Sequence, residues 1–251
     1  MSINERPKFA ARLHEIIKPW TTGLSFDTVL VLIAATIIII LFHDNCSSAI
    51  FRAHFLHHIP VGVPFRKLFP AFYWYGCSFM LLGVVPLMLG KWVIGRPAIE
   101  WGVGLGDWKF GLKAVLILYL AFMPILILVS FSPTFQHKYP LFAEAGNSTM
   151  HFIVYQAAYA VYFIGWEFIF RGFMLFGLRP ALGFYAVFIQ TIPFAIMHFG
   201  KPQLETIAAV FAGILLGYLA LRTRSFWYGW LLHSLIAISN DILAMLHKSW
   251  T

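Results

Sequence analysis

Long apolar runs are the feature that most limits what this chain can fold into. A helix needs about 20 apolar residues to cross the roughly 30 Å hydrocarbon layer of a bilayer. The 251-residue chain is 60% hydrophobic and only 11% charged, and seven runs of suitable length occur along it. We therefore predict an all-α, polytopic transmembrane bundle of about seven spans, within a range of six to eight. The runs cover residues 24–42, 68–90, 110–131, 150–171, 182–199, 204–221 and 226–247.

The basic residues indicate how such a bundle would be oriented. Mixed polar residues that include Arg6, Lys8 and Lys18 precede the first run, and no cleavable signal peptide is evident. With seven spans, the N-terminus and the even-numbered loops hold most of the lysines and arginines. The positive-inside rule then predicts a cytoplasmic N-terminus, and we expect a bacterial inner (plasma) membrane. The net charge of +8 suits anionic headgroups, so the bilayer is the expected partner and nucleic acid is not.

Polar patterning divides the chain into two parts. Residues 1–149 contain an N-terminal arm, three runs and few polar groups within those runs, so they are predicted to be supporting structure. Residues 150–251 contain four runs that carry ionisable side chains, and they are the predicted functional core. Gly213 and Gly217 have the small-xxx-small spacing that allows two membrane helices to pack closely.

Four ionisable residues of the second part suggest chemistry. Glu167 and Arg171 lie one helical turn apart in the fourth run, His198 ends the fifth and His233 lies in the seventh. Ionisable groups inside a bilayer are costly, so they face a bundle interior or a cavity. Each alone fits a structural bond between helices. Together they also fit hydrolysis, in which a carboxylate or imidazole takes a proton from water and a second imidazole stabilises an oxyanion. Arg171 would keep Glu167 ionised and oriented.

A metal is the alternative use of these side chains. Two histidines and one glutamate form a familiar zinc set, which here would consist of Glu167, His198 and His233. The compact HExxH spacing is absent, so the ligands would have to come from separate helices. Metal-free hydrolysis is therefore the favoured interpretation, with no cofactor expected and zinc as the open alternative.

Three ordered motifs resemble a known family. Glu-x-x-x-Arg-Gly at 167–172, Phe-x-x-x-His at 194–198 and a later histidine at 233 resemble the CPBP family. These are the CAAX proteases and bacteriocin-processing enzymes, also called ABI proteins, which include the type II CAAX prenyl endopeptidases. The resemblance covers residues 150–247 and implies an intramembrane endopeptidase that hydrolyses membrane-associated or lipidated protein substrates with Glu- and His-activated water. It also implies that a glutamate-type mechanism is favoured over a metalloprotease.

Two departures from the family pattern leave alternatives open. Trp166 replaces the first residue of the family's glutamate pair, which is its usual water-activating base, and Ala237 replaces the asparagine of His-x-x-x-Asn. We hypothesise that Glu205 or Asp241 supplies the lost polar function, and Asn240 lies on the His233 side of its helix. The alternative is a catalytically inactive relative that binds a lipidated peptide or a membrane partner. A small transporter ranks third, because no inverted repeat relates the two halves.

The depth of the four residues in the membrane sets a structural condition. Seven straight spans would leave Glu167 and His233 in one half of the membrane and His198 near the other face. A shared site therefore requires that the fifth span be broken or displaced, with 172–181 as an interfacial segment, or that the span boundaries differ. Pro193 would permit a kink. We expect His198, Glu167 and His233 to surround one cavity.

Overall fold

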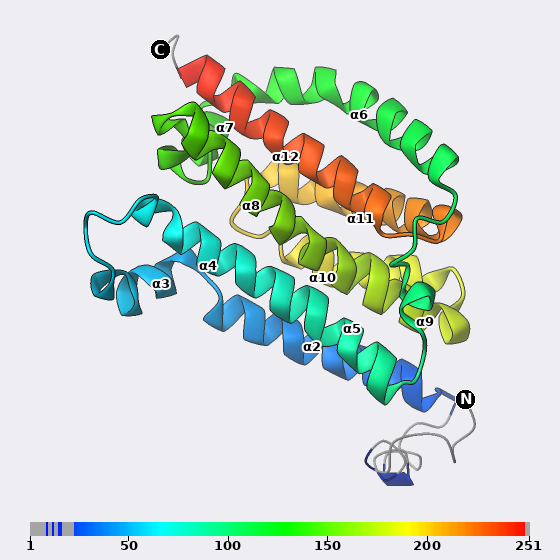
Figure 1. The fold of residues 1–251 in the computed structure, drawn as a ribbon. Coiled ribbons are helices and arrows are strands. Elements are labelled where there is room, and N and C mark those ends of the chain that lie inside the picture. Colours follow the sequence, from blue (N-terminus) through cyan, green and yellow to red (C-terminus); the bar gives the residue numbers. More distant parts are fainter. Residues whose placement is uncertain (1–8, 10–11, 13–14, 17–22, 249–251) are drawn as a thin grey trace.

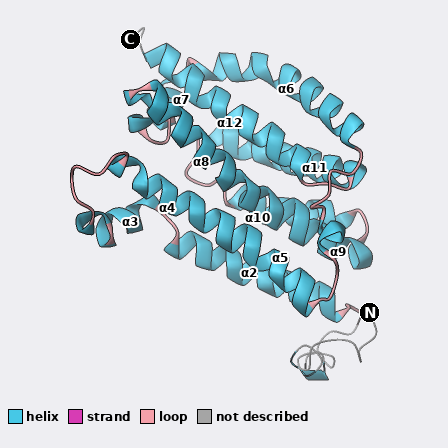
Figure 2. Ribbon diagram, viewed as in Figure 1, coloured by secondary structure: helices cyan, strands magenta, loops and turns pink. Residues whose placement is uncertain are grey.

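The computed structural model describes residues 9, 12, 15, 16 and 23–248. The predicted N-terminal arm, with Arg6, Lys8 and Lys18, lies outside the residues that it describes. Throughout the described part the regular structure is helical, and no strand occurs there (Figure 2). The long helices run roughly side by side as one bundle, with α8 in the middle (Figure 1). This arrangement confirms the predicted all-α polytopic fold.

The helices follow one another with short connections. Pro70 lies in the first turn of α4. Ser25, Asp107 and Ser148 cap other helices, since their side chains accept backbone N–H groups that a helix start leaves unpaired. The α-helices are α2 (Phe26–Asn45), α3 (Ser48–His54), α4 (Phe69–Cys77), α5 (Val85–Met88), α6 (Trp108–Ser130), α7 (Pro133–Lys138), α8 (Thr149–Glu167), α9 (Leu175–Leu182), α10 (Tyr185–Ile196), α11 (Gln203–Thr223) and α12 (Trp227–Lys248). Three π-helical segments continue α-helices, namely η5 (Ser78–Val84), η6 (Leu89–Val93) and η9 (Phe168–Met174). Short 3-10 turns are η3 (Leu56–His58), η4 (Arg66–Leu68), η7 (Ala98–Trp101) and η8 (Ala143–Asn147).

Six helices of the described chain are long and apolar enough to cross a bilayer. The exception among the seven predicted runs is 182–199, because its helix α10 is only 12 residues long. Residues 172–181 do not form a separate segment between two spans, which was one way to displace the fifth span. They extend the fourth span, which runs from Thr149 to Leu182 through α8, η9 and α9. The helix ends at Gly183, whose φ of +54° is a conformation that side chains with a Cβ rarely adopt.

The fourth span is the centre of the bundle. In its most apolar window 89% of the residues are buried, whereas the corresponding share in the other five spans lies between 11% and 44%. Gly165 allows this burial, because a Cβ there would lie 2.1 Å from the carbonyl oxygen of Ser78 in η5. The backbones of α8 and η5 therefore touch. Polar side chains in the middle of this helix, such as Glu167 and Arg171, are therefore enclosed by the protein itself.

The short helix α10 returns along the central span and then packs on α11. The predicted close approach at the two glycines of α11 is confirmed, since a Cβ on Gly213 would meet Thr191 at 2.7 Å and one on Gly217 would meet Gln190 at 3.0 Å. Because α10 starts just after α9 and runs back for only 12 residues, it ends beside the middle of the fourth span. The shortened fifth run thus brings His198 to the depth of Glu167.

One end of the bundle gathers the turns between several of the helices. The backbone N–H of Asp107, at the start of α6, donates to the carbonyl of Thr223 at the end of α11, at 3.0 Å. Arg96 donates to the carbonyl of Phe176 in α9, at 3.2 Å. We call this the α9 end, since α9 and α11 finish there and α6 and α12 begin there (Figure 1). The proposed division of the chain at residue 149 stays a prediction, although α4 and α6 pack directly on α8 and α12.

Candidate active site

Glu167 and Arg171 form a buried ion pair at the centre of the bundle. Glu167 is the last residue of α8, and Arg171 lies one turn later in the π-helical segment η9. Arg171 Nη1 donates to Glu167 Oε1 at 3.0 Å, and both side chains have no solvent exposure. The guanidinium carbon also lies 3.9 Å from the ring centre of Phe194. Removing one charge would strand the other away from water, which typically costs about 3–5 kcal/mol.

His233 of α12 extends this pair into a chain of three groups. Its Nδ1 lies 2.7 Å from Glu167 Oε1, and a carboxylate oxygen held by Arg171 can only accept, so Nδ1 carries the proton. Gly229, one turn earlier, makes room for the carboxylate, since a Cβ there would lie 2.7 Å from Glu167 Oε2. The His233 side chain retains 19% exposure. Its other nitrogen, Nε2, is therefore a hydrogen-bond acceptor on a ring that is only partly enclosed.

His198 supplies a second imidazole with the same tautomer. It follows the end of α10, and its Nδ1 lies 2.7 Å from the carbonyl oxygen of Phe194. A carbonyl can only accept, so Nδ1 donates and Nε2 is the acceptor. The rings of His198 and His233 are nearly parallel, with centres 6.4 Å apart. Burial lowers the pKa of His198, which lies outside the six spans, to about 4, so the ring is neutral at pH 7.

The structure therefore brings together the four residues that the sequence singled out as catalytic. Glu167, Arg171 and His233 are joined by hydrogen bonds, and His198 faces His233 across 6.4 Å. The separation by depth that seven straight spans would have caused does not occur. The side chains come from the central span, from the turn that follows α10 and from α12, in the order that the motifs suggested.

Trp166 occupies the place of the first glutamate in the family's pair. Its indole is 5% exposed, stacks on Tyr162 with ring centres 5.4 Å apart, and meets His198 edge-on at 5.8 Å. The indole Nε1 is buried and has no hydrogen-bond partner in the described chain. Ala237, one turn after His233, is also buried. An aromatic ring and a donor thus replace a carboxylate beside His198.

Two of the three supporting candidates, Glu205 and Asp241, make contacts elsewhere in the bundle. Glu205 accepts hydrogen bonds from the Tyr139 hydroxyl at 2.8 and 2.9 Å and pairs with Lys201 at 3.3 Å. We call Tyr139, Lys201 and Glu205 the Tyr139 cluster. Asp241, which is fully buried, accepts from Gln156 of α8 at 2.8 Å. Asn240 is buried beside it in α12. Glu205 has no hydrogen bond to His198 or His233 in the described chain.

Sequence reasoning missed Gly229, Tyr139 and Gln156. Gly229 has a signal, because it precedes His233 by one turn and so shares its helix face. Gln156 has a weaker one, as an amide inside a predicted span. Tyr139 has none, because it lies in a loop far from Glu205 in sequence and only the fold brings the two together.

The residues present do not fit the zinc set considered from the sequence. Glu167 Oε1 is already bound by Arg171 and by His233, so a metal on this carboxylate would lie beside a guanidinium. His233 would also have to bind through Nε2, on the ring side that faces away from its bond to Glu167. No group of three His, Cys, Asp or Glu residues in the described chain is arranged to hold a metal ion. We derive no step through a metal.

A comparison with known families decides the relationship. A family model described as type II CAAX prenyl endopeptidase Rce1-like matches residues 148–239. This segment belongs to the CAAX protease (CPBP) family. The match runs from the cap of α8 into α12 and so contains Glu167, Arg171, His198 and His233. No curated protein matches the chain, and no solved structure matches it.

The family relationship agrees with the resemblance that the three motifs carried. A CAAX protease domain is a membrane-embedded hydrolase domain, and the long apolar helices of this chain are those of an integral membrane protein. The family match does not specify the substrate, the catalytic mechanism or the membrane in which the protein lies.

Proposed function

We propose that the chain is an intramembrane endopeptidase in which His233, held by Glu167, activates water. The observation that carries the proposal is the chain of bonds from Arg171 through Glu167 to His233. In this chain of bonds the Nδ1 of His233 is occupied by Glu167, so Nε2 of the partly exposed imidazole is the atom that can act as the base. Glu167 is fully buried and already bonded, so it acts by orienting His233 and by stabilising the charge that this ring gains, as the carboxylate of a serine protease triad does.

The proposed hydrolysis conserves protons at named atoms. His233 Nε2 takes a proton from water as the water oxygen attacks the scissile carbonyl carbon, which leaves an oxyanion and an imidazolium beside Glu167. The imidazolium then gives the same proton to the leaving amine nitrogen, and the C–N bond breaks. The products are a carboxyl group and an amine, and His233 returns to its neutral form. The Glu167 carboxylate stays ionised throughout.

His198 and Trp166 have complementary parts in this proposal. The neutral His198 ring presents Nε2 as an acceptor, so it can hold the attacking water but cannot donate to an oxyanion. The Nε1–H of Trp166 is a buried donor without a partner in the described chain, and its ring meets His198 edge-on. We assign oxyanion stabilisation to Trp166 and water positioning to His198, whereas the sequence suggested a second imidazole for the oxyanion.

The substrate class follows from family and surroundings. A CAAX protease domain in a bundle of membrane-spanning helices suits a peptide that is anchored in or near the bilayer, including a lipidated one. Apolar rings surround the two histidines. The ring centre of Phe163 lies 4.2 Å from that of His233, and the ring centre of Phe194 lies 4.6 Å from that of His198. These surroundings suit an apolar segment of the substrate. We propose a bacterial inner membrane with the α9 end on the cytoplasmic side.

Peptide cleavage in liposomes tests this function directly. Lipidated and unlipidated membrane peptides would be incubated with wild type, His233→Ala and the control His43→Ala, which changes an exposed histidine at the end of α2. We expect cleavage by wild type and by the control, loss in His233→Ala, and no effect of a chelator. Chelator-sensitive cleavage would contradict the metal-free mechanism.

A catalytically inactive binding protein is the second candidate. Trp166 favours it, because an indole stands where the family has its usual base. In that case the domain would bind a lipidated peptide saturably and cleave none of the panel. Cleavage that depends on His233 would eliminate this candidate.

A further inference from the structure

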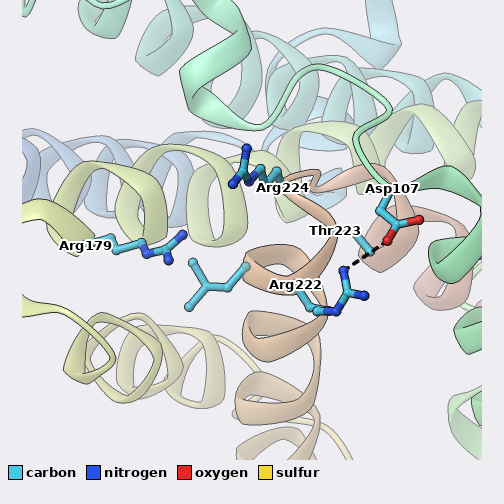
Figure 3. Close-up of a pocket in the computed structure, with 6 residues that line it drawn as sticks. Asp107, Arg179, Arg222, Thr223 and Arg224 are labelled. Atoms are coloured by element: carbon cyan, nitrogen blue, oxygen red, sulfur yellow. Dashed lines mark hydrogen bonds and ion pairs between the residues drawn. The ribbon is translucent and has the colours of Figure 1, made fainter.

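A cavity at the α9 end is lined by charge that the proposed reaction does not use. Its volume is about 450 Å³, and three of its six lining residues are arginines (Figure 3). This size lies in the range of small-molecule sites, about 300–1,000 Å³. None of the four proposed catalytic residues lines it. The lining residues are Asp107, Arg179, Leu221, Arg222, Thr223 and Arg224.

Arg222 has a local explanation. Its Nη1 lies 3.0 Å from Asp107 Oδ2, and both side chains are partly exposed. Asp107 also caps α6 by accepting the N–H of Phe110 at 3.2 Å. That backbone bond, followed by the bond to Arg222, lowers the pKa of Asp107 below its ordinary value. One of the three arginines is therefore accounted for by a link between α6 and α11.

Arg179 and Arg224 have no such explanation. Neither makes an ion pair or a side-chain hydrogen bond in the part of the chain that the structure describes. Arg179 lies in the last turn of α9, and Arg224 follows the end of α11. Figure 3 shows their side chains coming from two different helices toward the same space. A helix C-terminus favours one cation, but two guanidinium groups that line one cavity repel each other.

The backbone of Arg224 has a conformation that is costly for a residue with a side chain. Its φ and ψ are 56° and 37°, the left-handed conformation in which a helix usually ends on glycine. A residue with a Cβ is strained there. Strain of this kind is common at functional sites. Glycine would relieve the strain but would remove the guanidinium from the cavity.

Neighbouring aromatic residues place the cavity at the level of lipid headgroups. Trp108 directly follows Asp107, and Tyr185 follows the turn after α9; their side chains are 52% and 73% exposed. Exposed tryptophan and tyrosine at helix ends typically mark the boundary between hydrocarbon and water. The arginines of the cavity therefore lie where phosphate groups of lipids are concentrated.

We propose that this cavity binds a phosphate group through Arg179 and Arg224, with Arg222 beside them. Guanidinium groups bind phosphate oxygens in pairs of parallel hydrogen bonds, and an anion between two arginines offsets their repulsion. An anionic lipid headgroup and a soluble phosphate offer the same chemistry. The proposal is independent of proteolysis, because it involves none of the proposed catalytic groups.

Ligand-dependent stabilisation of the full chain in detergent tests this site. Thermal unfolding would be followed with phosphatidylglycerol, with inorganic phosphate and with the zwitterionic phosphatidylcholine as reference. We expect the anionic ligand to raise Tm in wild type and its affinity to fall about tenfold in Arg179→Gln/Arg224→Gln. The matched control is Lys91→Gln/Lys113→Gln, which removes two exposed lysines outside the cavity. A shift with phosphatidylglycerol alone assigns the lipid, and a shift with inorganic phosphate assigns the soluble source.

Arg224→Gly keeps the test decisive if the double variant folds poorly. Glycine suits the left-handed backbone, so we expect a higher Tm without ligand and a smaller shift with it. A purely structural arginine would not give this combination. An equal ligand-dependent rise in Tm in wild type and in both cavity variants would overturn the site. An equal loss of affinity in the lysine control would also overturn it, because it would indicate general charge attraction.

Discussion

Two ion pairs of this protein have the same i, i+4 spacing in the sequence but different surroundings. Glu167 and Arg171 are four residues apart and fully buried, and their partner is His233. Lys201 and Glu205 are also four residues apart, but their side chains are 23% and 30% exposed, and their partner is Tyr139. A tyrosine hydroxyl bonded to a carboxylate is a poor base at neutral pH, whereas a neutral imidazole is a good one. The i, i+4 spacing therefore accounts for the ion pair, and the side chain bonded to the carboxylate, His233 or Tyr139, determines what chemistry the pair supports.

Matched substitutions in the two pairs give the largest expected difference. Glu167→Gln should lower kcat about a thousandfold, because the amide neither fixes the His233 tautomer nor stabilises the imidazolium. Glu205→Gln should keep kcat within about twofold, since Glu205 orients no base. The measurement is peptide cleavage in liposomes with folded protein confirmed by its Tm. Equal losses in the two variants would remove the distinction between the pairs.

Stability should separate the pairs as well. Arg171→Met leaves the Glu167 carboxylate buried without its cation, so we expect a loss of about 3–5 kcal/mol in the free energy of unfolding. Lys201→Met leaves a partly exposed glutamate that keeps its bond to Tyr139, and the expected loss is at most about 1 kcal/mol. Denaturant unfolding in mixed micelles measures both. A loss below 1 kcal/mol in Arg171→Met would mean that water reaches the centre of the bundle.

The sequence predicted the buried pair better than its partners. The apolar runs predicted the spans, because a helix must be apolar to lie in lipid. Glu167, Arg171 and His233 stood out within these runs, because ionisable groups are costly to place in a membrane. The contact between α8 and α12 was not predictable, since it depends on space at Gly229 opposite the carboxylate. The family pattern indicated which residues should meet, but a sequence does not give the relative height of two helices.

The fifth run shows why the span boundaries were harder to predict. Residues 182–199 are mostly apolar. Such a composition shows that the segment can lie in lipid, but it does not show where the chain turns. Arg179 and Pro180 resemble the end of a span, yet α9 includes both and ends only at Leu182. The packing of α9 on α2 outweighs this local preference. The consequence is functional, because a full-length fifth span would have taken His198 away from Glu167.

Trp166 provides a smaller effect that tests the roles within the buried site. Trp166→Phe keeps an aromatic ring against Tyr162 and removes the Nε1–H donor together with one ring of the indole. If that donor stabilises the oxyanion, kcat should fall by a factor of about 10 to 100 with little change in KM. Tyr139→Phe, which removes a hydroxyl from the Tyr139 cluster, is the matched control and should change neither constant by more than about twofold. An unchanged kcat in Trp166→Phe would leave the indole as packing alone.

The pH dependence of stability gives the smallest effect and tests whether the buried site is dry. Burial lowers the pKa of His198 to about 4, below the value of about 6.5 for an unfolded histidine. The unfolded state therefore binds the proton first, so the stabilising contribution is complete above pH 6.5 and is lost as the pH falls toward 4. Between pH 7 and 5.5 the loss should be about 1 kcal/mol larger in wild type than in His198→Gln, which cannot titrate. Measuring unfolding of both proteins at the two pH values isolates this histidine from the carboxylates, which titrate in both. An equal loss of unfolding free energy in the two proteins would mean that His198 is hydrated. A hydrated His198 could take up a proton and donate to the oxyanion itself. The assignment of oxyanion stabilisation to Trp166 would then fail.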